Sequence, residues 1–249
     1  AAACPGGGAM LRCHPPMDTI VFDIEVAGLP WAELDQATRD YLLSRTGDAA
    51  ERDAVPERLA LYPGLGQVIA IGLWNLEADR GMMLLDGPSA AERDWERVPR
   101  ATLLRGGEAE LLQRFWEVLD RKRPRLVSFN GRGYDGPMLM IRSAQLGVAC
   151  TRNLVPNRYS IAEHCDLSDV LSFMGARREM YRLDYWCRRF GVESPKGGLD
   201  GSQVGRAYRE GRIEEIGEYC LRDVRATGEL YKKLEHSLLP LFSGGPRRA

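Results

Sequence analysis

The sequence TIVFDIE at residues 19–25 runs from an apolar segment into two carboxylates. Its β-branched and aromatic residues predict a buried strand over 19–24. Because successive side chains of a strand face opposite ways, Asp23 and Glu25 should share one face, with Ile24 on the other. Unpaired buried carboxylates are costly, and a divalent cation would offset that cost by using their oxygens as ligands. The alternative, in which the chain simply leaves the core toward solvent here, is equally compatible with this motif alone.

A further carboxylate follows a second apolar strand, predicted at 125–129 and turned by Asn130-Gly131. Asp135 stands just before a predicted helix over 136–146, two residues ahead of Pro137. Taken alone, this position favours a helix N-cap. It still leaves a carboxylate at the C-terminal edge of a strand, where α/β sheets place ligands.

The third motif, IGEYCLRDV, lies in one long predicted helix over 213–238. Tyr219 and Asp223 are four residues apart, so they point the same way. Their stripe borders the buried face of the helix. Taken alone, the motif favours a tyrosine packed in the core and an aspartate paired with Arg222 or Arg225.

The remaining pattern predicts one α/β domain over residues 18–240, preceded by a flexible leader or added residues at 1–17 and followed by a flexible tail at 241–249. The other predicted elements are a helix at 31–44, an irregular stretch at 45–66, a strand pair at 67–76 and 81–85, a charged connection at 87–105, a helix at 108–121, a short strand at 165–167, and helices at 183–190 and 202–210.

The composition suits a globular protein, with 44% hydrophobic and 28% charged residues among 249. Lys and Arg number 34 against 35 Asp and Glu, which argues against a histone-like binder held by phosphate neutralisation. The six cysteines form no CxxC and the three histidines lack zinc-finger spacing, so free thiols in a reducing cytoplasm are expected. No apolar run is long enough to span a bilayer, and no membrane partner is expected.

The chain resembles the DEDD exonuclease superfamily in its tyrosine-type branch, DEDDy. The resemblance rests on four segments that occur in this order: VFDIE, SFNGRGYDGPML, SPKGGLDGSQV and IGEYCLRDV. The likeness is to the predicted 3′-5′ exonucleases related to the proofreading domain of B-family DNA polymerases, and it runs from about residue 18 to 235. It implies a ribonuclease H-like α/β fold, with a central mixed β-sheet flanked by α-helices.

The resemblance also implies roles for five residues. Asp23 would bridge two divalent cations, Mg²⁺ or Mn²⁺; Glu25 and Asp223 would complete one metal site, and Asp135 would serve the second, partly through water. Tyr219 would orient the attacking water and assist its deprotonation. The implied activity is removal of nucleoside 5′-monophosphates from the 3′ end of DNA, with single-stranded ends as the partner and no obligate protein partner. The alternatives are a 3′-5′ exoribonuclease using the same site, with RNA as the partner, and a non-catalytic nucleic-acid-binding module.

Secondary candidates lie around these motifs. By resemblance, Phe129 and Asn130 approach the substrate strand, although Asn130 is equally compatible with a plain turn. Lys196 is a candidate phosphate contact, with a solvated loop lysine as the favoured alternative, and Arg132 is a similar case.

Other features have structural interpretations. The cluster EHCDLSDVL, with His164, Cys165, Asp166 and Asp169, is interpreted as structural. Four tryptophans are expected in the core: Trp74, Trp95, Trp116 and Trp186. Residues 31–66 either line the substrate channel or form a surface insertion. Similar proteins often carry Thr where this chain has Val26, and the missing hydroxyl would weaken a contact near the terminal sugar.

Overall fold

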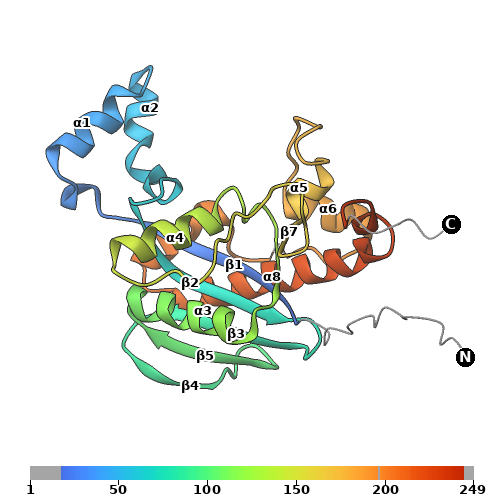
Figure 1. Cartoon of the computed structure of the whole chain (residues 1–249). Coiled ribbons are helices and arrows are strands. Elements are labelled where there is room, and N and C mark those ends of the chain that lie inside the picture. The colour runs from blue at the N-terminus through green and yellow to red at the C-terminus, as the bar shows by residue number, and fades with distance from the viewer. Residues whose placement is uncertain (1–17, 196, 244–249) are drawn as a thin grey trace, which may run out of the picture.

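A seven-stranded mixed sheet organises residues 18–195 and 197–243, the part of the chain that the computed structural model describes (Figure 1). The strand order is β4-β5-β3-β2-β1-β6-β7. β1 pairs antiparallel with β2 and parallel with β6, so it lies at the centre of the sheet. The strands are β1 (Thr19–Gly28), β2 (Gly66–Asn75), β3 (Arg80–Asp86), β4 (Ala90–Asp94), β5 (Ala101–Gly106), β6 (Arg125–Ser128) and β7 (His164–Asp166).

Helices cover both faces of this sheet. One face packs against α3 (Glu108–Lys122) and α4 (Asp135–Gln145). The other packs against α5 (Leu167–Leu171), α6 (Leu183–Phe190), α7 (Val204–Arg209) and α8 (Ile213–Glu235). The predicted mixed sheet flanked by helices is therefore confirmed.

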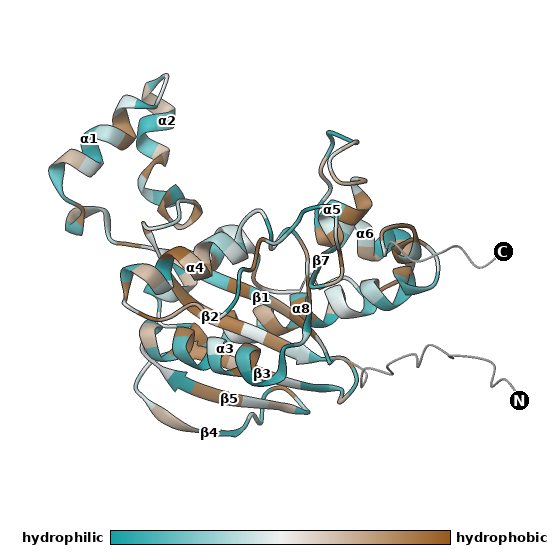
Figure 2. Ribbon diagram, in the orientation of Figure 1, coloured by the Kyte–Doolittle hydropathy of each residue, from teal (hydrophilic) through white to brown (hydrophobic). Residues whose placement is uncertain are grey.

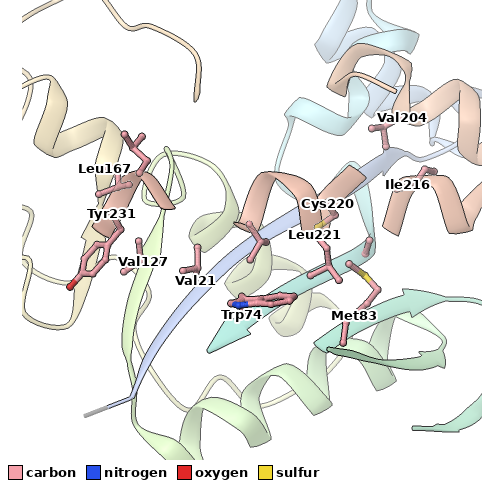
Figure 3. Packing of buried hydrophobic residues seen from close by; sticks show 14 of the residues in the cluster. Val21, Trp74, Met83, Val127, Leu167, Val204, Ile216, Cys220, Leu221 and Tyr231 are labelled. Atoms are coloured by element: carbon pink, nitrogen blue, oxygen red, sulfur yellow. The ribbon is translucent and has the colours of Figure 1, made fainter. Parts of the chain in front are cut away.

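Alternate side chains of β1 point to opposite faces of the sheet and so enter two different cores. Ile20, Phe22 and Ile24 join the core under α3 and α4, whereas Val21 joins the core under α8. Figure 2 shows β1 and β2 as largely hydrophobic, as expected for strands buried on both faces. In Figure 3, Cys220 and Leu221 of α8 lie over the strands that carry Val21 and Trp74.

Three predicted stretches differ from the structure. The connection at 87–105 is wrong, because it contains β4 and β5. All five side chains of β4 are exposed, so this edge strand has no buried residues to create a pattern. The helix at 31–44 is interrupted, because Asp35 caps α1 (Gln36–Ser44) after a separate 3-10 turn, η1 (Trp31–Glu33). Likewise, the helix at 202–210 consists of η3 (Gly201–Gln203) and α7.

Residues 45–66 are not irregular. They form α2 (Ala49–Ala54) and η2 (Pro56–Leu61), which with α1 enclose a small core of their own, made of Leu34, Leu42, Val55 and Leu59. In Figure 1 this helical segment projects from the sheet, and the Tyr134 hydroxyl donates a hydrogen bond to its Ala60 carbonyl at 2.8 Å. The segment is thus a folded insertion between β1 and β2 that contacts the rest of the domain near Ala60.

Other expectations are met in the described part of the chain. Trp74, Trp95 and Trp116 are buried, and Trp186 packs against the α8-side core. The four cysteines outside residues 1–17 are free thiols. Within residues 18–195 and 197–243, no helix combines the length and apolarity that a membrane crossing requires. After α8 the chain continues into η4 (Leu239–Leu241), where Leu239 is buried.

Candidate active site

Two carboxylates of β1 face α8. The carboxylate oxygens of Asp23 and Glu25 and the Cys220 Sγ all lie within 4.8 Å of one another. The predicted shared face is therefore confirmed. The strand stays in the interior past both residues, since Val26 and Ala27 are buried, so this segment does not leave the core at the motif.

Asp135 reaches β1 from the neighbouring helix. β6 pairs with β1 only from Thr19 to Val21, which leaves the following edge of β1 without a strand partner. The Oδ1 atom of Asp135 accepts a hydrogen bond from the Ile24 amide there, at 3.0 Å. The N-cap interpretation of Asp135 is wrong, because Tyr134 occupies the N-cap position and Asp135 is the first residue of α4, with its side chain accepting a hydrogen bond from β1.

α8 supplies the tyrosine and the fourth carboxylate. Tyr219 and Asp223 are both half-buried, and the Tyr219 hydroxyl donates a hydrogen bond to the Asp223 carboxylate. The Asp223 Oδ1 atom is buried and has no hydrogen-bond partner among the described residues. Asp223 forms no direct ion pair with an adjacent arginine among the described residues, because Arg222 donates to the Gly197 carbonyl at 3.0 Å and Arg225 lies over the Trp74 ring. The Arg222 charge nevertheless lowers the pKa of Asp223.

A glycine in β2 determines how closely α8 approaches these acids. Gly72 is the register partner of Asp23, and a Cβ atom there would lie 3.0 Å from both Cys220 Sγ and Val224 Cγ2. The absent side chain lets the Cys220 thiol reach the Asp23 carbonyl oxygen at 3.5 Å. Sequence reasoning missed Gly72 and Cys220; a glycine interrupting the apolar run IAIGLW was the available signal of a close approach.

Burial and mutual repulsion dominate the electrostatics of the four acids. Burial raises the pKa of Asp135 to about 7 and that of Asp223 to about 6. The pKa values of Asp23 and Glu25 lie well above their ordinary values for the same reason, and repulsion from the other site carboxylates raises them further. The hydrogen bond from Tyr219 partly lowers the pKa of Asp223. Converging acids of this kind are stable in their ionised form only with a nearby positive charge.

The donor set fits hard divalent cations. It consists of carboxylate oxygens from three elements, one of them the buried Asp223 Oδ1 that no described group satisfies. Oxygen donors are the preferred ligands of Mg²⁺ and also suit Mn²⁺. Asp23, Glu25, Asp135 and Asp223 could therefore hold such ions.

A pocket of about 760 Å³ opens beside Tyr219 and Asp223. Its other walls are the start of α6, from Arg182, and the loop around Gly198 to Ser202. The Arg222 hydrogen bond to Gly197 ties this loop to α8, and Asp200 fixes its far end by accepting from the Ser202 amide at 2.9 Å. The predicted phosphate contact Lys196 lies outside the described residues.

The other predicted substrate contacts occupy the loop before α4. Asn130 is exposed and has a left-handed backbone, with φ of 64°, as an Asn-Gly turn predicts, whereas Phe129 is half-buried against the α8-side core. The substrate-contact interpretation of Arg132 is wrong: it is buried, pairs with Asp169 at 3.3 Å and donates to the Pro156 carbonyl. Val26 also points away from the acids, because it packs in the core under α3.

The cluster at 164–169 holds that loop in place. Asp166 accepts hydrogen bonds from the amides of Asn130 at 2.8 Å and Arg132 at 2.9 Å, and it caps α5 by accepting from Ser168. The buried His164 ring bonds the Ser128 hydroxyl and the Leu154 carbonyl, both at 2.7 Å. The structural interpretation of this cluster is confirmed.

Comparison with known proteins gives both a family and a fold. Residues 89–239 match the family described as "Predicted 3'-5' exonuclease related to the exonuclease domain of PolB", a span that includes Asp135, Tyr219 and Asp223 and begins after β1. No curated protein matches the chain.

Among solved structures, the family B DNA polymerase from the hyperthermophilic archaeon Pyrobaculum calidifontis superposes with a TM-score of 0.54 and 21% sequence identity. The match covers 89% of this chain and 25% of the polymerase, so this chain corresponds to about a quarter of that protein's length. The likeness identifies the sheet and its flanking helices as a ribonuclease H-like fold.

Proposed function

Because this chain belongs to the family of predicted 3′-5′ exonucleases related to the exonuclease domain of PolB, we propose that it hydrolyses DNA from single-stranded 3′ ends and releases nucleoside 5′-monophosphates. The family makes it an enzyme acting on nucleic acid. The finer assignment, to the tyrosine-type DEDD branch, rests on one observation. Asp23, Glu25, Asp135 and Asp223 converge from β1, α4 and α8, with the Tyr219 hydroxyl hydrogen-bonded to Asp223.

Two divalent cations, Mg²⁺ or Mn²⁺, are the proposed cofactors. When bound, such a pair stabilises both the attacking and the leaving oxygen of an in-line displacement at phosphorus. Asp23 is the proposed shared ligand, Glu25 and Asp223 complete one position, and Asp135 serves the other. The raised carboxyl pKa values support this assignment, because a cation favours the ionised form that burial opposes.

Tyr219 is proposed to position the attacking water. Burial and the adjacent carboxylates hold its pKa well above the usual range, so the hydroxyl keeps its proton at neutral pH and acts as a hydrogen-bond donor. Its oxygen lies beside Gly201, where a Cβ atom would be 3.8 Å away, so the hydroxyl borders the pocket. Since the one hydroxyl proton is donated to Asp223, the hydroxyl oxygen can accept a hydrogen bond from the attacking water and so orient it.

The pocket is the proposed seat of the 3′-terminal nucleotide. Its lining includes Gly197, Gly198 and Gly201, whose backbone can approach a sugar or phosphate closely because no side chain intervenes. The space lies on the open side of Tyr219 and Asp223, so a strand end placed there would present its last phosphodiester to the carboxylates. A frayed or single-stranded end can enter such a space more easily than a paired end.

Digestion of 5′-labelled and 3′-labelled single strands, with Mg²⁺, Mn²⁺ or EDTA, tests the proposal. We expect a stepwise ladder from the 5′-labelled strand and immediate release of labelled mononucleotide from the 3′-labelled strand, only with metal. Asp23→Ala and Asp223→Ala should abolish both, and Asp53→Ala, at an exposed position on α2, should not. Internal cuts, or full activity in the Asp23→Ala variant, would contradict the proposal. Matched DNA and RNA strands in the same assay identify the preferred sugar.

A further inference from the structure

A stack of arginine and tyrosine side chains crosses the outer surface of α6. The Tyr181 and Tyr185 rings are stacked, with centroids 4.4 Å apart and planes inclined by 19°. The Arg177 guanidinium lies 5.7 Å from the Tyr181 centroid, and the Arg189 guanidinium lies 6.0 Å from the Tyr185 centroid. The four residues, called here the tyrosine–arginine stack, form one continuous column of planar groups.

The stack packs against the protein on one side and is exposed to solvent on the other. Trp186 packs edge-on against both tyrosines, and it is itself half-buried against the α8-side core. Tyr185 remains 36% exposed, and Arg189 is exposed. The column is therefore held by the fold on one side, and its outer edge and its Arg189 end are accessible.

The charge of this surface is unlike that of the whole chain. Residues 173–190 contain five arginines and two carboxylates, a surplus of three positive charges in a chain whose net charge is −1. Arg188 is paired with Asp184 at 2.9 Å. Arg182 and Arg189 make no ion pair with a carboxylate of the described residues. At the inner end of the column Glu179 lies 3.9 Å from the Arg177 guanidinium and accepts a hydrogen bond from the Tyr181 hydroxyl at 2.6 Å. The Arg189 end and Arg182 have no carboxylate partner among the described residues, and they suit a polyanion that carries planar groups.

The stack is continuous with the proposed active-site pocket. Arg182 caps the start of α6 and lines the pocket together with Tyr219 and Asp223. Arg182, Tyr185 and Arg189 follow at helical spacings of three and four, so they share the solvent face of α6. From Arg182 to Arg189 the helix rises roughly 10 Å, so the two guanidinium groups can contact different phosphates of one strand.

We infer that the tyrosine–arginine stack is a binding platform for the single strand upstream of its 3′ end, where a base stacks on the outer face of the Arg189 guanidinium that Tyr185 supports, and phosphates contact Arg182 and the edge of Arg189. The inference rests on the proposed function for the position of the 3′ end. Stacking on a guanidinium plane held over an aromatic ring tolerates every base, and arginine adds backbone contacts without sequence preference. The platform therefore takes single strands of any sequence, provided that they extend beyond the pocket.

Fluorescence anisotropy with a labelled 15-mer and a labelled dinucleotide, in Ca²⁺ to limit cleavage, tests the platform. We expect Tyr185→Ala to weaken binding of the 15-mer about tenfold, the order expected for one stacked base. The loss on the dinucleotide should be much smaller, because the dinucleotide ends near the pocket. Tyr185→Phe, which keeps the ring, should retain the affinity.

The salt dependence gives a second measurement. Arg189→Gln should reduce the slope of log K against log salt for the 15-mer by about 0.7, as expected for one phosphate contact of a single strand. Arg121→Gln, an exposed arginine at the end of α3 on the opposite layer, is the charge-matched control and should change neither slope nor affinity. Thermal unfolding of each variant checks that the fold is intact.

Unchanged 15-mer affinity in Tyr185→Ala and Arg189→Gln would overturn the inference, and so would equal losses on the 15-mer and the dinucleotide. Equal losses would show that the residues act through the pocket. If the wild type binds the 15-mer through the stack and yet cleaves no strand with Mg²⁺ or Mn²⁺, the proposed function fails and the platform stands. If it cleaves and the variants bind normally, only the platform fails.

Discussion

Replacement of Asp135 by Asn should stabilise the metal-free protein at alkaline pH while it abolishes activity. The Oδ1 atom of Asp135 accepts from the Ile24 amide at 3.0 Å, and an asparagine oxygen can accept the same bond. The substitution therefore keeps the contact and removes one of four mutually repelling charges. If Asp135 instead stabilised the fold through its charge, the Asp135→Asn variant would be less stable than the metal-free wild type.

The magnitude and the pH range follow from the pKa of Asp135. Burial and nearby carboxylates raise the pKa of Asp135 from 3.8 to about 7, so between those pH values the folded state binds a proton that the unfolded state has lost. The free energy of unfolding of the metal-free wild type must then fall as pH rises from about 4 to about 7, and stay low above that. The full effect of this shift corresponds to about 4 kcal/mol, which is an upper limit because the charged site can relax and admit water.

Urea unfolding in EDTA at pH 5 and pH 8 measures this effect, with the buried Trp74, Trp95 and Trp116 as fluorescent reporters. At pH 8 the Asp135→Asn variant should be more stable than the wild type by at least about 1 kcal/mol, which is about 2–4 °C in Tm for a chain of this size. At pH 5 the difference should be less than half as large, because most of the effect develops between pH 5 and pH 7. The control is Asp53→Asn, because Asp53 is exposed on α2 and makes no hydrogen bond or ion pair with the described residues.

Excess Mg²⁺ should reverse the order at pH 8. A cation that binds only the folded state adds about 2.7 kcal/mol when present at 100 times its dissociation constant. The wild type should gain more than Asp135→Asn, which lacks one ligand. A metal-free variant less stable than the wild type at pH 8 would refute the reasoning, since it would show that the four carboxylates do not repel one another.

Three further variants test how the site is positioned. Gly72→Ala should lower the free energy of unfolding, measured in urea, by about 1–3 kcal/mol and should also reduce kcat, because the added Cβ meets Cys220 of α8 at 3.0 Å. Unchanged stability and rate would show that α8 can shift without disturbing the fold or the site. Asp166→Asn should destabilise by about 1–3 kcal/mol, because an amide group would face the Arg132 amide that the carboxylate now satisfies; equal unfolding midpoints would contradict this role. Tyr219→Phe should lower kcat roughly 100-fold with a smaller change in KM, the order of effect of losing one preorganised hydrogen-bonding group. A normal kcat in steady-state digestion would exclude Tyr219 from water positioning.

The elements with regular burial were predictable from sequence, and those without it were not. α8 was predicted because its buried residues recur every three or four positions, and β1 because a strand buried on both faces reads as one apolar run. β4 was missed because all its side chains are exposed and charged or small. Its place in the sheet depends on pairing with β5, which local sequence does not encode.

In the site too, contacts within one element could be predicted from sequence, whereas contacts between elements could not. The shared face of Asp23 and Glu25 follows from the two-residue period of a strand, and the pairing of Tyr219 with Asp223 follows from the helical turn. The bond of Asp135 to β1 could not be inferred, because it depends on where β6 stops along β1. Gly72 and Cys220 are likewise joined only by the packing of α8 on the sheet.

The arrangement of the cores explains how the fold tolerates the four carboxylates of the proposed active site. Four carboxylates that destabilise one another are carried by β1, α4 and α8, and each of these elements is held by apolar packing away from the acids. β1 contributes to both cores, so its two acids cannot separate without opening both layers. α4 and α8 press on β1 from opposite layers, which brings Asp135 and Asp223 toward Asp23 at the expense of stability. A cation that binds the folded chain recovers that loss, and metal affinity and resistance to unfolding should therefore change together whenever one of the four acids is replaced.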